Sequence, residues 1–212
     1  EVGQHVLKGQ LIAEPDGKVS AAVHASSSGV VRAIGKFPVP HVSGLPDDCI
    51  VIDTDGRDAW AELVPLDPDA PPAELLESLR MLGVAGLGGA VFPTQIKLAT
   101  HAPCPTLIVN GGECEPWITC DDALMRHRAD TVLDGVAIMR RLLGSTEVLV
   151  GIEDNKAEAI AAMTLAAEKL DFACEIVPVP AIYPGGGAKQ MIETLTGRQV
   201  PSGKLSTDIG IQ

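Results

Sequence analysis

A proline-rich stretch, Leu66–Pro72, separates two kinds of hydrophobic pattern and limits the folds open to this chain. Its three prolines remove backbone donors and fix φ, so the stretch can form neither a helix interior nor a central strand. Short β-branched runs precede it, and helical periodicity alternating with short apolar runs follows it. The sequence therefore predicts a small all-β domain over residues 1–66 and an α/β domain over residues 73–212.

The first domain is predicted from apolar runs of period two that are broken by Gly, Pro, Asp and Ser. Side chains alternate between the two faces of a strand, so this period is typical of half-buried strands. The strands are expected within Val6–Ile12, Val19–Val23, Gly29–Val31 and Ile50–Asp53.

The second domain is predicted from alternating β and α patterns with short connections. Such an order gives a mostly parallel sheet with right-handed crossovers, here in a Rossmann-like three-layer α/β fold. Gly144 and Gly197 follow two of the helical patterns, where a left-handed residue is favoured. The expected helices are 73–82, 130–143, 156–170 and 188–196, and the expected strands are 106–109, 148–152 and 173–179.

The charge balance excludes several kinds of partner. The chain has 28 acidic and 16 basic residues and a formal net charge of −12, which argues against nucleic acid and anionic membranes. Its longest uncharged run, Met81–Ile96, contains glycines and Pro93 and is shorter than the roughly 20 apolar residues of a spanning helix. We therefore expect no direct membrane insertion.

The cysteines and histidines give no metal-binding pattern. The five cysteines include no C-x-x-C pair, and the five histidines include no H-E-x-x-H. We expect no metal site in this chain. An odd number of cysteines without a signal peptide favours a reducing compartment, and the ends at Glu1 and Gln212 suggest a fragment of a longer protein.

Three glycine-rich segments are the candidate binding loops: Gly86–Lys97, Asn110–Trp117 and Tyr183–Lys189. They contain eight of the 22 glycines and three of the six aromatic residues. Ligands of open parallel sheets bind beyond the carboxyl ends of the strands, where such loops lie. The sequence therefore predicts one site built from the three segments.

The composition of these segments suits a flat, anionic cofactor. Glycines let backbone N–H groups approach a phosphate or a ring, and Lys97 adds a positive charge. Neither the G-x-G-x-x-G fingerprint nor a Walker A motif is present. Glu113 and Glu115 can serve a cofactor and a sugar hydroxyl, or form a solvated acidic turn. The glycines can also do no more than reverse the chain, and the aromatic side chains can be core filler.

Four ordered motifs resemble a known family. They read Gly-x-Gly-Gly-Ala-x-Phe-Pro-Thr-x-x-Lys at 86–97, Asn-Gly-Gly-Glu-Cys-Glu-Pro-Trp-Ile-Thr-Cys-Asp-Asp at 110–122, Gly-Ile-Glu-Asp-Asn-Lys at 151–156 and Tyr-Pro-Gly-Gly-Gly-Ala-Lys-Gln at 183–190. This order resembles the RnfC component of the bacterial Rnf electron-transport complex over essentially the whole chain. The same loops are more distantly similar to the flavin- and NADH-binding subunit of respiratory complex I.

The resemblance implies a flavoprotein that oxidises NADH within an ion-translocating NADH:ferredoxin oxidoreductase. A hydride would pass from NADH to FMN, and single electrons would then reach two 4Fe–4S clusters in a C-terminal domain outside this chain. No side chain is needed as an acid or base. The implied partners are the other Rnf subunits, at the cytoplasmic face of the inner membrane, to which the protein is peripheral. The implied FMN residues are Gly86, Gly88, Gly89, Lys97, Asn110, Glu113, Tyr183, Gly186 and Gly187, and the implied NADH residues are Phe92 and Glu115.

The chain departs from the family pattern at the glycine loop. Val91 stands where the family has a second glycine, Gly112 where the complex I relative has an aspartate, and Gly187 and Ala188 where it has two glutamates. If position 91 requires a positive φ, valine costs about 1–3 kcal/mol there. The alternatives are therefore a docking scaffold of the same complex that does not hold flavin, or an unrelated phosphate-binding α/β enzyme.

The first domain resembles the barrel-sandwich-hybrid fold of biotinyl and lipoyl carriers, most clearly at His24–Val31. Carriers of this type present a modifiable lysine at a hairpin tip. The corresponding position lies near Gly17, and its neighbour Lys18 lacks a Met-Lys-Met or Asp-Lys-Ala context. A docking or structural role is expected for this domain.

Overall fold

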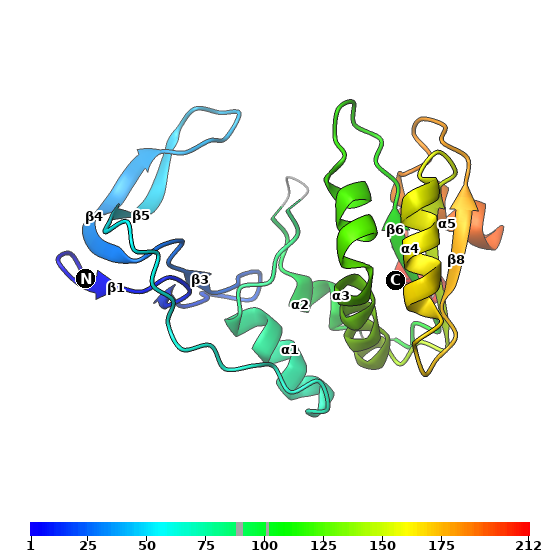
Figure 1. The fold of residues 1–212 in the computed structure, drawn as a ribbon, viewed down its shortest axis with the longest axis horizontal. Helices are drawn as coiled ribbons and strands as arrows, with labels where there is room; N and C mark the ends of the chain where they lie inside the picture. The colour runs from blue at the N-terminus through cyan, green and yellow to red at the C-terminus, as the bar shows by residue number, and fades with distance from the viewer. Residues whose placement is uncertain (88–90, 101) are drawn as a thin grey trace. The chain divides into compact units, whose positions relative to one another are not determined.

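The computed structural model describes residues 1–87, 91–100 and 102–212 (Figure 1). The chain forms two compact units, residues 1–96 and residues 97–212. Each unit is described by itself below.

The N-terminal part of the first unit is built of antiparallel strands, which confirms its all-β class. Alternation along the strands places Val31 in the core and Val30 in solvent. Val6, Ala25 and Val31 form the centre of that core, with Ile12, Ile50 and Ile52 packed around it. One sheet has the order β1-β4-β5 and the other pairs β2 with β3; the strands are β1 (His5–Val6), β2 (Leu11–Ala13), β3 (Val23–His24), β4 (Gly29–Pro38) and β5 (Pro46–Thr54).

Helix α1 (Pro72–Met81) is tied to the segment that precedes β3. The backbone N–H of Ala22 donates to Arg80 O at 3.0 Å, and Arg80 Nη2 donates to Gly17 O at 3.0 Å. Because of these contacts the compact units divide after Ile96, whereas the predicted linker is Leu66–Pro72. The helix begins at a proline, where the missing N–H costs nothing.

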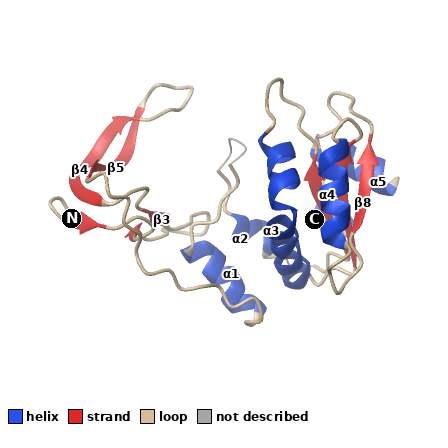
Figure 2. Cartoon of the chain, in the orientation of Figure 1, coloured by secondary structure: helices blue, strands red, loops and turns tan. Residues whose placement is uncertain are grey.

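The second unit combines helices and strands (Figure 2). Its strands form a parallel sheet with the order β6-β7-β8. β7 is buried along almost its whole length, as is typical of a strand covered on both faces. The predicted α/β class with a parallel sheet is therefore confirmed. Its strands are β6 (Thr106–Gly111), β7 (Glu147–Glu153) and β8 (Glu175–Val179), and its helices are α3 (Cys120–Leu143), α4 (Ala157–Ala167) and α5 (Ala188–Thr196).

The last residues of the chain pair with the outer edge of β6. Thr106 N donates to Gly210 O at 3.3 Å, Gln212 N donates to Thr106 O at 3.1 Å, and Ile108 N donates to Gln212 O at 2.8 Å. The bridge between Thr106 and Ile211 is parallel, like the rest of the sheet. Ile211 is fully buried in this position.

The predicted start of the long helix is wrong. α3 begins at Cys120, ten residues before the predicted Asp130, and it bends at Arg128, where φ is −137° and ψ is 31°. Glu113, outside the helix, accepts hydrogen bonds from the N–H groups of Asp121 and Asp122 and so holds the first turn. A cap from so far along the chain leaves no local motif in the sequence.

The predicted helix ends at Gly144 and Gly197 are confirmed, because both residues have left-handed backbone angles. Two short elements were not expected, α2 (Thr94–Leu98) and the 3-10 helix η1 (Ser206–Ile209). α4 also ends three residues before the expected Leu170, and β8 begins two residues after the expected Ala173. Among the described residues, no helix is both long and apolar enough to cross a membrane.

Candidate functional site

The second and third glycine-rich segments lie together in the second unit, at the carboxyl ends of its strands. Asn110, near the end of β6, donates from Nδ2 to Gly186 O at 2.7 Å. Its Oδ1 accepts from Gly112 N at 3.0 Å. One amide side chain therefore joins the loop after β6 to the loop after β8.

The two loops approach so closely that only glycine fits. A Cβ on Gly112 would lie 2.9 Å from Gly186 Cα, and a Cβ on Gly186 would lie 2.6 Å from Cys114 Sγ. Gly186 N also donates to Cys114 Sγ at 3.1 Å. The result is an edge of bare backbone, which is the surface a flat ring or a phosphate can approach.

Glu113 follows Gly112 in the same loop, and its side chain is only 1% exposed. Its carboxylate accepts from Asp121 N at 2.8 Å, from Asp122 N at 3.3 Å and from Lys156 Nζ at 3.2 Å. These partners neutralise and satisfy the buried charge. Glu113 N in turn donates to Glu153 Oε2 at 3.4 Å, so the 151–156 motif supports the same loop.

Several side chains of the two loops are directed to solvent. Tyr183 is 81% exposed, Trp117 is 99% exposed, and Glu115 is also exposed. Trp117 has φ of 68°, a left-handed angle that is uncommon for a bulky residue. Gly187 is the residue before the first turn of α5.

The first glycine-rich segment forms a hairpin in the first unit. Gly86 N donates to Phe92 O at 3.0 Å, and Thr94 N donates to Val84 O at 3.0 Å. Val91, on the returning side of this hairpin, has φ of 46°. The sequence predicts strain at position 91 if its φ is positive. The φ of this β-branched residue is positive, so the strain is present.

The structure describes only some of the remaining residues of this segment. Gly88 and Gly89 lie outside the described residues. Lys97 lies in the last turn of α2 and is exposed. In the described part of the chain, Gln95 Oε1 is the one side-chain oxygen or nitrogen that is buried without a hydrogen-bond partner. The sequence did not single out Gln95, because glutamine in a short helix has no distinctive pattern.

The geometry fits a flavin nucleotide better than a metal ion. Glu113, Cys120 and Asp121 have ligand atoms within 4.8 Å of one another. The Glu113 carboxylate is already occupied by two backbone N–H groups and Lys156. In contrast, Gly112 and Gly186 are half-buried and carry no side chain that would cover the backbone edge between the two loops. The role of Cys114 as a hydrogen-bond acceptor was also missed, because free cysteines more often act as small apolar residues.

Two protein families match this chain. A family described as the Nuo51 FMN-binding domain matches residues 79–212, and the RnfC barrel sandwich hybrid domain matches residues 1–57. The chain belongs to the Nuo51 FMN-binding family. The expected barrel-sandwich-hybrid domain at the N-terminus is confirmed at the level of the family.

The curated relatives are named as the C component of an ion-translocating oxidoreductase complex. The chain is 55% identical to the protein of Pseudomonas aeruginosa, 46% to that of Pasteurella multocida and 46% to that of Rhodobacter capsulatus. These alignments cover 97–100% of this chain but 26–40% of the relatives. The resemblance to the RnfC component of the Rnf complex is confirmed, and the chain is a fragment by comparison with these relatives.

A solved structure shares the fold of part of the chain. The crystal structure of an NAD+-reducing NiFe hydrogenase in the air-oxidised state aligns with a TM-score of 0.52 at 25% identity. The alignment covers 60% of this chain and 24% of the hydrogenase chain.

Proposed function

We propose that this chain is the part of an electron-transfer subunit that binds FMN and NADH in an ion-translocating NADH:ferredoxin oxidoreductase. The observation that carries the proposal is the backbone edge at Gly112 and Gly186, tied together by Asn110, in a chain of the Nuo51 FMN-binding family. The names of the curated relatives support an electron-transfer role.

The proposal assigns the flavin contacts as follows. In the second unit, Asn110 holds the backbone edge that would meet the flavin, Gly186 forms part of that edge, and Gly187 and Tyr183 border it. Glu113 supports this loop through its contacts with Lys156 and the start of α3. In the first glycine-rich segment, the FMN contacts are assigned to Gly86, Gly88, Gly89 and Lys97.

NADH is assigned to Phe92 and Glu115. FMN supplies the redox chemistry when bound, because it accepts a hydride from NADH and releases electrons singly. The protein contributes orientation, since two rings held at near-attack distance need no acid or base. The proposal includes two 4Fe–4S clusters in the part of the protein outside this chain, the other Rnf subunits as partners and a peripheral position at the cytoplasmic face of the inner membrane.

The docking scaffold remains the second candidate, and the strained backbone of Val91 favours it. A β-branched residue at φ of 46° costs about 1–3 kcal/mol relative to an unstrained backbone. Its side chain is 62% exposed on the loop that would face FMN. Both features reduce the affinity expected for a flavin.

Titration of the purified protein with FMN distinguishes the two candidates. Flavin fluorescence is followed for the natural chain and for Val91→Gly, and NADH is then added under anaerobic conditions. Micromolar binding followed by bleaching of the bound flavin supports the oxidoreductase proposal. Absence of binding by both proteins, measured with the protein at the full length of its relatives, supports the scaffold.

A further inference from the structure

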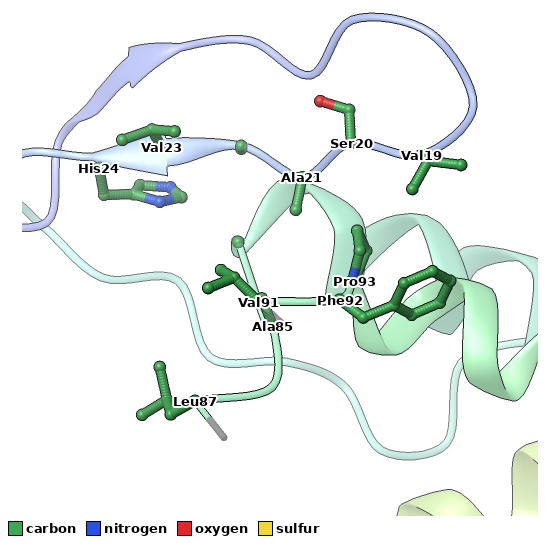
Figure 3. Close-up of a pocket in the computed structure, with 12 residues that line it drawn as sticks. Val19, Ser20, Ala21, Val23, His24, Ala85, Leu87, Val91, Phe92 and Pro93 are labelled. Atoms are coloured by element: carbon green, nitrogen blue, oxygen red, sulfur yellow. The ribbon is translucent and has the colours of Figure 1, made fainter. Parts of the chain in front are cut away.

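The first unit contains a cavity of about 560 Å³ between the β strands and the glycine-rich hairpin (Figure 3). This volume lies within the range of small-molecule sites. One wall is the segment Val19–His24, which leads into and forms β3. The other wall is formed by Gly83, Ala85, Leu87, Val91, Phe92 and Pro93.

The two walls are fixed to each other by close backbone contacts. Gly83 follows α1 with φ of 71°, and a Cβ on it would lie 2.4 Å from Ala22 O. Ala22 N donates to Arg80 O at the end of α1. Arg80 Nη2 also donates to Gly17 O, just before the first wall. The cavity is therefore a built feature of this unit.

The lining selects an uncharged occupant. Its described members are apolar apart from Ser20 and His24, and none of them is Lys, Arg, Asp or Glu. Ser20 Oγ accepts from Asp16 N at 3.1 Å, which leaves its O–H able to donate. The imidazole of His24 can donate or accept. Such a lining suits a flat heteroaromatic ring with its own donors and acceptors and does not suit a phosphate.

We infer that Val19–His24 forms the second wall of the site for the adenine base of NADH, with Ser20 and His24 as its specificity-determining polar groups. This inference rests on the proposed function, in which NADH is the substrate. The nicotinamide ring must leave one face open to the flavin. A ring held between two protein walls has no such face, so the cavity suits the base that does not react.

This role gives the N-terminal β domain a direct function in substrate recognition. Figure 3 shows Val19, Ser20 and Ala21 on one side of the cavity and Ala85, Val91 and Phe92 on the other. The β segment thus supplies the polar recognition groups, and the hairpin supplies the aromatic ring of Phe92. A purine matches this pair of walls through its flat faces and its edge nitrogens.

The test is Ala21→Phe in the protein expressed at the full length of its relatives. Ala21 lines the cavity and is half-buried, so a phenyl ring there fills the space. Binding of ADP-ribose, measured by calorimetry, reports on the adenine half without any need for flavin. We expect its dissociation constant to rise about tenfold or more. The matched control is Ala73→Phe, at an exposed position of α1, which should leave ADP-ribose binding unchanged.

A kinetic comparison provides the second measurement. Ala21→Phe should raise KM for NADH but not for reduced nicotinamide mononucleotide, which lacks the adenosine half. Unchanged ADP-ribose binding, or equal effects on both reductants, would overturn the inference and leave the cavity to an acyl chain or an apolar peptide. If Ala21→Phe does not fold, Ser20→Ala decides, with an expected loss of about threefold in ADP-ribose affinity. If the natural protein does not bind FMN at all, that result contradicts the proposed function instead.

Discussion

Glu113 shows how a single residue can serve both a binding loop and a helix. Its buried carboxylate caps the first turn of α3 and pairs with Lys156, whose side chain is only 17% exposed. The motif that contains Glu113 was found in the sequence, but the carboxylate's partners were not, because Lys156 lies more than forty positions away along the chain. Long-range pairing of this kind leaves no trace in local periodicity.

Glu113→Gln should destabilise the second unit. The amide keeps one acceptor oxygen, so one of the two helix N–H groups and the Lys156 ammonium lose their charged partner. We expect a loss of about 1.5–3 kcal/mol in the free energy of unfolding, measured with urea. Glu158→Gln, at an exposed partner of Arg126, is the control and should cost far less. Equal effects of the two substitutions would contradict the capping role.

Val91→Gly should strengthen FMN binding. Glycine adopts a φ of 46° without strain and removes a side chain that is 62% exposed. We expect the dissociation constant for FMN to fall by up to about tenfold, measured by quenching of flavin fluorescence. Val84→Gly, in the same hairpin but at a residue without positive φ, should bring no such gain. A weaker or unchanged affinity for Val91→Gly would argue that this position does not limit binding.

At the scale of elements, the periodicity of the sequence predicts most strands and helices. The exceptions depend on contacts of individual side chains. The bounds of α1, β6, β7 and α5 lie within two residues of the expected ones, because each element buries one regular apolar face. The early start of α3 depends on Glu113, and its bend at Arg128 interrupts the helical period that would have extended the prediction. The glycine-rich loops were found from composition, but their contact through Asn110 depends on the tertiary fold.

Gly186→Ala should disturb the loop after β8 by a clash with Cys114. The new Cβ would lie 2.6 Å from Cys114 Sγ, a separation that requires movement. We expect a loss of about 1–3 kcal/mol in the free energy of unfolding. In a Cys114→Ala background the loss should become smaller, because the sulfur is gone, and a double-mutant cycle measures this coupling.

Gly135→Ala is the control for that cycle. Gly135 lies within α3 with no atom in the space a Cβ would occupy, so alanine should stabilise the helix by about 0.5–1 kcal/mol. If Gly186→Ala cost the same with and without Cys114, the close approach of the two loops would not be the cause.

At the scale of the whole chain, the division into units reflects packing that the sequence pattern does not record. The proline-rich stretch marks a change of periodicity, and the family models likewise leave residues 58–78 unmatched. The structure nevertheless groups α1 and the glycine-rich hairpin with the β strands, through the contacts of Ala22 with Arg80 and Gly83. The glycine-rich hairpin thus lies within the residues matched by the FMN-binding family but packs in the same unit as the β strands.

The first unit should lose stability in acid through Asp55. The N–H of Arg57 and the hydroxyl of Ser28 donate to its carboxylate and lower the pKa of Asp55 below its ordinary value of 3.8. A carboxyl whose folded-state pKa is lowered stabilises the fold above the unfolded pKa, and this stabilisation disappears as the pH falls through the folded value.

Asp55→Asn should therefore lower the melting temperature at pH 7, and the difference from the natural chain should shrink below about pH 4. Thermal melts followed by circular dichroism between pH 3 and pH 7 measure this. Asp47→Asn, an exposed carboxylate 3.9 Å from Lys36, is the control and should show little difference at any pH. A constant difference for Asp55→Asn across the range would exclude ionisation as the cause.

The exposed indole of Trp117 gives this protein an optical probe of its own. The chain has two tryptophans, and the other, Trp60, lies beneath the ammonium of Lys8 in the first unit. Replacing Trp60 with phenylalanine leaves one indole, at the edge of the loop between Glu115 and the start of α3. Its emission overlaps the absorption of flavins, so occupancy of the neighbouring loops can be followed by energy transfer from a residue that needs no label.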